Sequence, residues 1–356
     1  MSAARTAAAA AFQAAGGARL FRAASNRWSL EIGRGGLRLE RRSAPPFLIL
    51  IYHRVHPRPG PFMIDAIPPE RFERQMEHLA SAYRPLALEE LVERSRAGTV
   101  PKGAVAVTFD DGYADNHEHA LPVLLRHGIP ATVFLVTGCV GTGIAPWHDQ
   151  VLLAFASTRR EQVRVPGPAA DAPPLPLRTE KERRSAAFRV LAALKAMPEA
   201  ERLAAVERLR AELGGERDAA AESGLMLDWD RVRAMKSAGV RFGSHTETHP
   251  ILSRVTRERA REEITRSKRA IEAELGEEVR LFAYPNGRTE DYTDDTVALL
   301  REAGYRAAVT TVFGANETGD DPFRWRRGTP WEDDPGRFAL KLAYYRLRAA
   351  RPRRSA

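Results

Sequence analysis

The sequence predicts an α/β fold in which a mostly parallel sheet closes into a distorted β/α barrel, complete or incomplete, that carries a helical insertion. Three observations support this prediction. Short apolar runs rich in β-branched residues recur along the chain, helical patterns separate many of them, and one long helical segment interrupts the alternation. Because the apolar runs are continuous rather than alternating, both faces of the sheet should be covered, which is typical of parallel strands joined by helices.

Each strand is predicted from its own run of apolar residues. The predicted strands span residues 47–52, 104–109, 131–136, 240–243, 279–283 and 306–310. Between the first two, residues 69–83 carry Phe72, Met76 and Leu79 at helical spacing. A second helical pattern covers residues 256–276 and ends at a glycine. Strand and helix therefore alternate as in repeated βα units.

The segment from about residue 154 to 225 breaks this alternation. It begins with a turn-rich Pro/Ala stretch and continues as two Arg/Glu/Ala/Leu-rich helical patterns separated near Pro198. We interpret it as an insertion between barrel strands that acts as a lid or a docking surface. The predicted organisation is a basic Ala/Arg-rich segment over 1–44, a main domain over 45–345 with this insertion, and a basic tail over 346–356.

The positive charge of the chain lies at its two ends. The formal net charge is +9, but residues 1–42 contain eight Arg and two Glu, and residues 346–356 contain five Arg and no acid. The part between is slightly acidic, which argues against a nucleic-acid groove across the fold. The basic ends could instead contact an anionic membrane surface, or they could be solvated tails.

Localisation is predicted from weak signals. The Ala-rich start, with Gln13 inside it, is a poor export signal, and no run is long and apolar enough to span a bilayer. The single cysteine, Cys139, excludes an intramolecular disulfide and is predicted as a small buried residue. We favour the cytoplasm or the cytoplasmic face of a membrane, with export as the alternative.

Two adjacent carboxylates end one of the predicted strands. The motif TFDDGYADN places Asp110 and Asp111 directly after strand 104–109, and Gly112 permits a turn that brings both into one site. Like charges this close repel each other unless a cation holds one of them. The motif therefore indicates a metal or catalytic site, and a solvated Asp-Asp-Gly turn is the alternative.

A pair of histidines follows another predicted strand. In GSHTETHP, His245 and His249 lie four residues apart, and Pro250 disfavours a helix at that point, so we expect both on a loop. Two histidine nitrogens and one carboxylate oxygen form a usual catalytic zinc site with one position open for water. The two motifs together predict such a site.

These two motifs resemble those of the polysaccharide deacetylase family, the NodB-like domains of carbohydrate esterase family 4. The resemblance covers about residues 45–330, apart from the insertion. It implies that Asp110 is the general base and that Asp111, His245 and His249 hold a divalent metal, expected to be Zn²⁺. It also implies an oxyanion site at the backbone N–H of Tyr113.

A third segment resembles the groove wall of the family. In FAYPNGR, Tyr284 and Pro285 are predicted to contact substrate, and a tight turn is the alternative. The family more often has an arginine before the Pro-Tyr pair, and its absence leaves the base without its usual partner. Arg326 or Arg327 could supply that partner from elsewhere in the chain.

The catalytic acid is sought at the start of the domain, because the chain has no histidine after His249. His53 ends the first predicted strand, in FLILIYHRVHP, which resembles the circularly permuted arrangement of the poly-β-1,6-N-acetylglucosamine deacetylases. If this strand completes the barrel beside the last one, His53 faces the metal; a structural histidine is the alternative. Trp147, His148 and Asp149, in APWHDQ, are predicted to border the cleft. An aromatic ring there could stack on a sugar, with buried packing as the alternative.

The resemblance implies removal of N-acetyl groups from an exopolysaccharide or cell-envelope glycan by metal-activated water. The alternatives are O-deacetylation, deformylation of a lipid-linked sugar, or a carbohydrate-binding pseudoenzyme. A nucleic-acid partner is not expected. The linkage of the glycan and the oligomeric state are not predicted.

Overall fold

The computed structural model describes residues 28–33, 36–41, 44–167, 172–214 and 224–347. Its centre is a parallel sheet whose strands are ordered as they occur along the chain. These are β3 (Leu48–Tyr52), β7 (Ala104–Phe109), β8 (Ala131–Leu135), β11 (Arg241–Ser244), β12 (Leu281–Ala283), β13 (Ala307–Phe313) and β14 (Trp325–Arg327). The six predicted strands are confirmed within one to three residues, and β14 is an addition. A short strand, β6 (Arg84–Pro85), also pairs with β7.

The sheet closes because its last strand reaches its first. The backbone N–H of Ile51 donates to the carbonyl of Gly328 at 3.0 Å, and the N–H of Gly328 donates to the carbonyl of Ile49 at 2.7 Å. These bonds join β3 to the residue that follows β14. The predicted barrel is therefore confirmed, and its first and last strands are neighbours.

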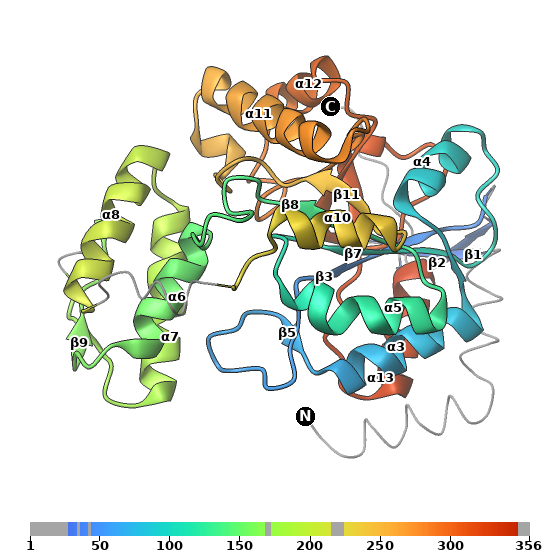
Figure 1. Cartoon of the computed structure of the whole chain (residues 1–356). Coiled ribbons are helices and arrows are strands. Elements are labelled where there is room, and N and C mark those ends of the chain that lie inside the picture. The colour runs from blue at the N-terminus through green and yellow to red at the C-terminus, as the bar shows by residue number, and fades with distance from the viewer. Residues whose placement is uncertain (1–27, 34–35, 42–43, 168–171, 215–223, 348–356) are drawn as a thin grey trace.

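Helices cover the outside of the barrel (Figure 1). They are α3 (Pro69–Ala82), α4 (Leu88–Arg96), α5 (Leu121–His127), α10 (Trp229–Ser237), α11 (Arg257–Leu275), α12 (Asp294–Glu302) and α13 (Pro335–Leu347). The predicted helices 69–83 and 256–276 correspond to α3 and α11. The strands are buried on both faces, as their continuous apolar runs predict.

Alternate strand residues face the barrel interior. Ile49, Ala106 and Val309 belong to one buried cluster inside the barrel, whereas their neighbours Leu50 and Val107 belong to the cluster beneath the helices. This period of two continues past the strand ends. It therefore decides which polar residues at the carboxyl edge of the sheet face inward.

The insertion forms a separate helical lobe beside the barrel (Figure 1). It consists of α6 (Trp147–Ser157), α7 (Glu180–Lys195) and α8 (Glu199–Glu212), with a two-stranded ribbon of β9 (Gln162–Val163) and β10 (Leu175–Pro176). The lobe has its own apolar core, which begins at Trp147 rather than near residue 154. The two predicted helices separated near Pro198 are confirmed as α7 and α8. The capping box of Thr179 and Glu182 starts α7.

The start of the chain contains a hairpin that the sequence reasoning missed. β1 (Trp28–Gly33) pairs antiparallel with β2 (Gly36–Arg41). Of the basic segment 1–44, for which membrane contact is predicted, residues 1–27 lie outside the described part, as does most of the predicted tail 346–356. Cys139 is buried, as predicted. No helix in the described ranges is long and apolar enough to cross a bilayer.

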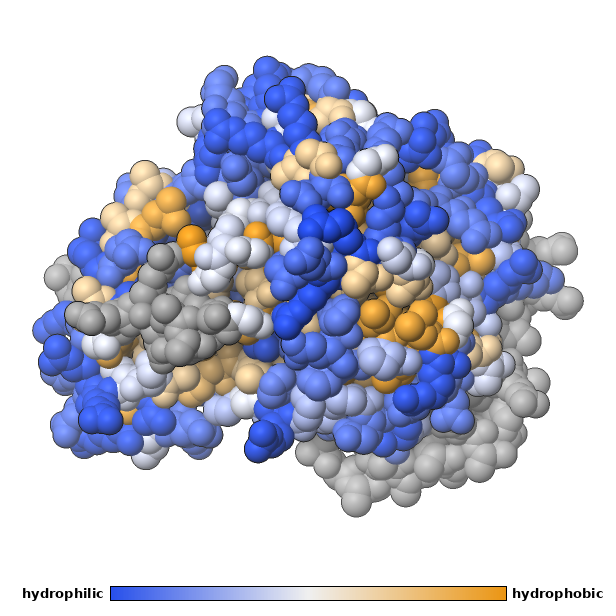
Figure 2. Space-filling view, in the orientation of Figure 1, coloured by the Kyte–Doolittle hydropathy of each residue, from blue (hydrophilic) through white to orange (hydrophobic). Residues whose placement is uncertain are grey.

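The surface of the molecule is mostly hydrophilic on the face shown in Figure 2, with apolar side chains in separate groups. One pair of short strands and one helical turn complete the fold near the cleft described below. They are the parallel pair of β4 (Arg54–Val55) and β5 (Ala66–Ile67), and a π-helical turn at Asn116–Ala120.

Candidate active site

At the ends of three strands, a position that faces the barrel interior is occupied by a polar residue. Asp110 follows Ala106 and Thr108 at two-residue intervals, and Arg327 follows Trp325 in the same way. His53 continues the inward series of β3, which passes through Ile49. All three therefore meet at the carboxyl edge of the sheet, which is the usual position of active sites in β/α barrels.

Asp110 is paired with a buried arginine from the last strand. The Arg327 guanidinium donates to Asp110 Oδ1 at 2.7 Å and to Asp110 Oδ2 at 2.6 Å. It also donates to the Thr310 carbonyl at 2.7 Å. Both side chains are almost fully buried, at 0% and 2% exposed. Of the two arginines proposed as partner of the base, Arg327 therefore takes that position.

This pair keeps Asp110 ionised. Burial acts to raise the pKa of Asp110, but the positive charge and hydrogen bonds of Arg327, together with His245 and His53, outweigh it. The net result is a pKa below the usual value of a carboxyl. The side chain can therefore accept a proton at neutral pH.

The backbone turns sharply at Asp111, so that its side chain joins the same site as that of Asp110. Asp111 has a φ of 71°, in the left-handed region that non-glycine residues rarely adopt. Gly112, with a φ of 83°, follows it, and a Cβ at this position would lie 2.7 Å from Leu135 Cδ2. The left-handed conformation therefore favours glycine at this position of the Asp-Asp-Gly motif, and a Cβ there would also require the Leu135 side chain to move.

The two histidines converge on Asp111 from the loop after β11. His245 Nε2 lies 3.6 Å and His249 Nε2 lies 3.4 Å from Asp111 Oδ1. His245 Nδ1 contacts the Ala283 carbonyl at 2.7 Å. This contact requires the proton to be on Nδ1, which leaves the lone pair of Nε2 directed toward Asp111. The loop placement predicted from Pro250 is confirmed.

These three residues fit a divalent metal. Their ligand atoms all lie within 4.8 Å of one another, and all three side chains are buried. Among the described residues, Asp111 Oδ1 has no hydrogen-bond partner, although a buried carboxylate oxygen normally has one. Burial lowers the pKa of His245, and burial and the neighbouring His148 and His245 lower that of His249 further. The neutral imidazoles and the orphaned oxygen form a donor set suited to Zn²⁺.

His53 faces the cleft and is held by its surroundings. Its Nδ1 lies 3.8 Å from Asp65 Oδ2, and burial raises the pKa of Asp65 although His53 opposes this. The Asn116 side chain, in the π-helical turn, donates to the His53 carbonyl at 2.8 Å. Arg54 next to it is bonded to Asp115 at 2.7 Å. The prediction that His53 approaches the site from the first strand agrees with this geometry.

The cleft between barrel and lobe has a volume of 450 Å³. Its floor holds Asp110, Asp111, His245 and His249, and His53 and Asp65 lie on one wall. The remaining lining residues are Ile51, Ile64, Tyr113, His148, Leu191, Lys195, Asn286, Arg288, Thr311, Val312, Phe313, Thr329 and Trp331. Barrel and lobe both contribute to it.

Backbone strain is concentrated around this cleft. Among the described residues, the non-glycine positions with positive φ are Asp65, Asp111, Thr246, His249 and Asn286. Four of them line the cleft, and Thr246 lies between the two histidine ligands. Because such conformations persist only where the surrounding structure enforces them, their concentration here is independent evidence for a functional site.

The backbone and the side chain of Tyr113 have different surroundings. The bonds from Ala114 N–H to Leu225 and from Leu227 N–H to Gly112 flank the bridge between Tyr113 and Met226. In an antiparallel bridge of this kind, the N–H of the central residue points away from its partner strand. The Tyr113 hydroxyl, in contrast, donates to Asp149 at 2.7 Å. The backbone N–H is therefore not used by this bridge.

Three residues predicted to contact substrate are buried instead. Tyr284 is fully buried, donates its hydroxyl to the Phe323 carbonyl at 2.9 Å and stacks on Tyr292 at 4.1 Å. Pro285 is also buried and does not line the cleft. The tight-turn alternative holds for Tyr284 and Pro285, whereas Asn286 and Arg288 of the same segment line the cleft.

Trp147 also differs from its prediction. It is 4% exposed, its indole N–H donates to the His249 carbonyl at 3.0 Å, and the Arg202 guanidinium lies 5.0 Å from its ring. The buried-packing alternative therefore holds. Trp147 supports the histidine loop from behind, and the neighbouring His148 lines the cleft.

Sequence reasoning missed several residues of the cleft. Asp65 belongs to no recognisable sequence motif. Its left-handed backbone conformation, which is visible only in the structure, distinguishes it as a residue of the site. Asn286 lies in FAYPNGR, where its residue type predicts no more than a turn. Lys195 and Leu191 come from the insertion, where their helical spacing carries no information about a cleft on another domain.

Comparison with known proteins identifies the family. A family model described as polysaccharide deacetylase matches residues 97–308, which is more than half of the chain. The chain belongs to the polysaccharide deacetylase family. The matched part includes the Asp-Asp-Gly and histidine motifs and contains the helical lobe.

Two curated relatives differ in how much of the chain they match. YxkH of Bacillus subtilis, which carries the name of this family, is 22% identical over 251 residues, covering 70% of this chain and 60% of YxkH. The poly-β-1,6-N-acetyl-D-glucosamine N-deacetylase of Staphylococcus aureus is 39% identical over 72 residues, covering 20% of this chain and 25% of that protein. The chain thus spans less than two thirds of either relative.

A solved structure supports the fold. IcaB from Ammonifex degensii superposes with a TM-score of 0.56 and 21% sequence identity, covering 85% of this chain and 98% of that chain. This likeness concerns the fold, and it agrees with the nearly closed parallel barrel flanked by helices.

Proposed function

We propose that this protein is a metal-dependent hydrolase that removes N-acetyl groups from a polysaccharide. One observation carries the proposal. An ionised carboxylate, Asp110, is fixed by Arg327 directly beside the Asp111, His245 and His249 set, which fits a divalent cation. A base next to such a donor set is the arrangement that hydrolysis by activated water requires. Membership of the family supports the same reaction.

Asp111, His245 and His249 would hold the metal, with Zn²⁺ as the expected ion. When bound, such a cation lowers the pKa of a coordinated water and polarises the acetamide carbonyl. The chain supports this role through the contact of His245 Nδ1 with the Ala283 carbonyl, which directs Nε2 inward. Trp147 holds the His249 carbonyl at the other end of the loop.

Asp110 acts as the general base and takes a proton from the attacking water. Arg327 prepares it by holding both carboxylate oxygens, so the side chain has little freedom to rotate. The pair also keeps Asp110 ionised before attack, because its pKa lies below the usual value. The attack forms a tetrahedral centre on the former acetamide carbon. Its developing negative charge would be stabilised by the backbone N–H of Tyr113.

His53 acts as the general acid that protonates the departing sugar amine. It lies on the cleft wall, with Asp65 Oδ2 3.8 Å from its Nδ1. The carboxylate of Asp65 therefore lies on the Nδ1 side of the imidazole ring. The proton passes from His53 to the amine as the carbon–nitrogen bond breaks, and acetate is the other product.

The substrate class follows from the family and from one relative. We infer an N-acetylated exopolysaccharide or envelope glycan, and the match with the Staphylococcus aureus enzyme favours a β-1,6-linked N-acetylglucosamine polymer. The exposed aromatic side chains of Phe313 and Trp331 support a sugar substrate, because they line the cleft and offer rings for stacking.

The proposal is tested by acetate release from β-1,4- and β-1,6-linked N-acetylglucosamine oligomers with Zn²⁺-loaded protein. Asp110→Asn should lower kcat by about 10²–10⁴, because the base is removed while the metal-binding residues remain. Asp230→Asn is the matched control, since Asp230 is 91% exposed and lies outside the cleft. Its rate should equal that of the wild type.

Two results would contradict the proposal. Equal rates of wild type and Asp110→Asn would remove Asp110 from the mechanism. The absence of acetate release from both oligomers by metal-loaded wild type would contradict N-deacetylation of these glycans.

A further inference from the structure

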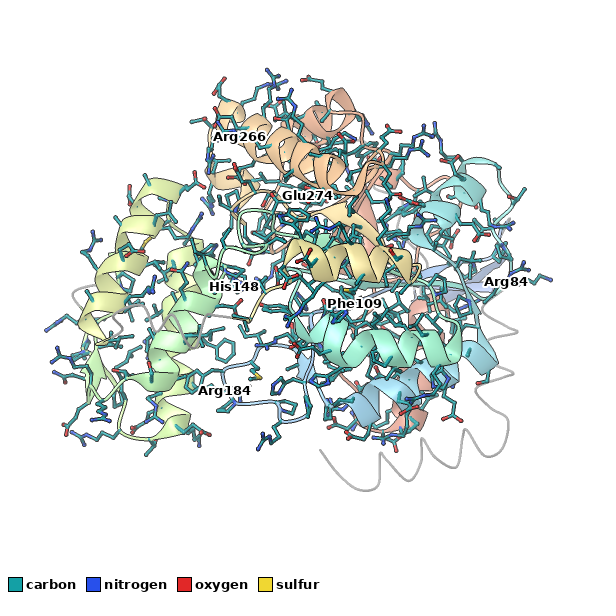
Figure 3. All side chains as sticks on the ribbon, viewed as in Figure 1. Arg84, Phe109, His148, Arg184, Arg266 and Glu274 are labelled. Carbon is teal, nitrogen blue, oxygen red and sulfur yellow. The ribbon has the colours of Figure 1, made fainter. Side chains whose placement is uncertain are left out.

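The mechanism gives no role to His148, although this residue lies inside the site. Its Nε2 is 4.0 Å from Asp111 Oδ2, and its ring centroid is 4.7 Å from that of His249. The side chain is 14% exposed and lines the cleft. Figure 3 shows His148 where the helical lobe meets the barrel. It is the second residue of α6, so the lobe begins at the site itself.

The two oxygens of Asp111 face different partners. Oδ1 faces Nε2 of His245 and Nε2 of His249, at 3.6 and 3.4 Å. Oδ2 faces His148. A carboxylate that binds a metal through one oxygen is oriented by whatever contacts its other oxygen, and such outer contacts affect metal affinity. His148 Nε2 lies on the side of such an outer contact, at 4.0 Å from Oδ2, which is longer than a hydrogen bond.

His148 is itself positioned by a series of buried groups. Its Nε2 lies 3.5 Å from Asp149 Oδ2, and the Tyr113 hydroxyl donates to the same oxygen at 2.7 Å. The Arg54 guanidinium lies 4.8 Å from the centre of the Tyr113 ring. Asp149 is 7% exposed and Tyr113 is 4% exposed. These contacts join the start of the lobe to the loop after β7, which carries Asp111.

His148 does not belong to the metal-binding set itself. Among the described residues, a group of at least three possible ligand atoms that all lie within 4.8 Å of one another is formed by Asp111, His245 and His249, and His148 is not part of it. We propose that His148, supported by Asp149 and Tyr113, is a positioning residue that holds the outer oxygen of Asp111 and thereby tightens metal binding. This inference rests on the proposed metal site and extends it to the insertion.

The test is the affinity for Zn²⁺, measured by competition with a chromophoric chelator. His148→Ala should bind Zn²⁺ about 10–100-fold more weakly than wild type, the usual cost of losing an outer contact to a metal ligand. His148→Gln, which keeps an N–H donor, should recover part of the affinity. Tyr113→Phe should weaken binding in the same direction by a smaller factor. His127→Ala, which changes a histidine outside the cleft, should bind as wild type does.

The absorption spectrum of the Co²⁺-loaded proteins separates positioning from direct binding. The ligand-field bands of saturated His148→Ala should match those of wild type, because the bound atoms are unchanged. A changed spectrum would overturn the inference by making His148 a direct ligand, and wild-type Zn²⁺ affinity in His148→Ala would overturn it by making the residue irrelevant. If wild type itself bound no Zn²⁺, the proposed metal site would fail, and this inference with it.

Discussion

The barrel and the helical lobe are built on different principles. In the barrel, strands in chain order bring Asp110, His53 and Arg327 to one edge, although these residues are far apart in the sequence. The lobe instead packs three consecutive helices on a local core and sends only a few side chains toward the cleft. The comparison teaches that the proposed reacting groups come together through long-range closure, whereas the lobe adds a few lining residues to the cleft from locally formed helices.

The strongest test of the barrel's role is Arg327→Met. Removing one partner of a buried ion pair leaves the other charge unpaired, so the free energy of unfolding should fall by about 3–5 kcal/mol. Acetate release should fall as well, because Asp110 loses the group that orients it. Urea unfolding measures the first effect. Arg266→Met is the control, because Arg266 is 56% exposed and its ion pairs should contribute little.

The pH dependence of the free energy of unfolding shows whether charge causes the loss of stability in Arg327→Met. The pKa of folded Asp110 lies below its usual value, so the folded chain binds fewer protons there than the unfolded chain. This stabilisation is complete above the usual carboxyl pKa, near 4, and is lost as the pH falls through the lower folded value. The difference in stability between wild type and Arg327→Met should therefore narrow toward pH 3. A constant difference would show that packing, not charge, is responsible.

The next largest effect is expected for His53→Gln. Loss of a general acid should lower kcat by about 10²–10⁴. Zn²⁺ affinity should not change, because His53 is outside the metal-binding set. Steady-state kinetics and chelator competition measure the two quantities. His56→Gln is the matched control on the same segment, since His56 contacts Arg58 and does not line the cleft. If His53→Gln kept full activity, the acid would have to be sought elsewhere in the cleft.

The smallest effect on activity is expected from the lobe core. Leu194 is fully buried there, and Leu194→Ala should destabilise the lobe by about 2–5 kcal/mol. Hydrogen exchange should show reduced protection in α7 and α8, whereas the barrel strands should keep theirs. An equal loss of protection in both would show that barrel and lobe unfold as one cooperative unit, contrary to the comparison.

The same contrast explains which parts of the molecule could be predicted. Strands such as β7 were found because a parallel strand buried on both faces has a continuous apolar run. Asp110, Asp111, His245 and His249 were found because each lies in a short local motif. β14 was missed because it has three residues and contains two arginines. Its role was nevertheless anticipated through Arg327.

For other residues, the sequence does not show whether the side chain is buried or lines the cleft, because this depends on contacts with segments that are distant in the sequence. Tyr284 and Asn286 are two positions apart, and only the turn with a φ of 59° at Asn286 decides which one reaches the cleft. Trp147 and His148 are adjacent, and the helix that begins there buries the first and exposes the second to the cleft. Asp65 lies in a loop whose conformation depends on contacts with the rest of the fold.

The closure between β3 and the residue after β14 also constrains when the protein can become active. Arg327 bonds to Asp110 across 217 residues of sequence, and His53 follows the first strand of the barrel, β3. A nascent chain released before β14 would contain the complete metal-binding motifs but neither the partner of its base nor a closed barrel. Contacts this distant in sequence form slowly during folding. Recovery of activity after dilution from denaturant should therefore follow barrel closure and come later than Zn²⁺ binding.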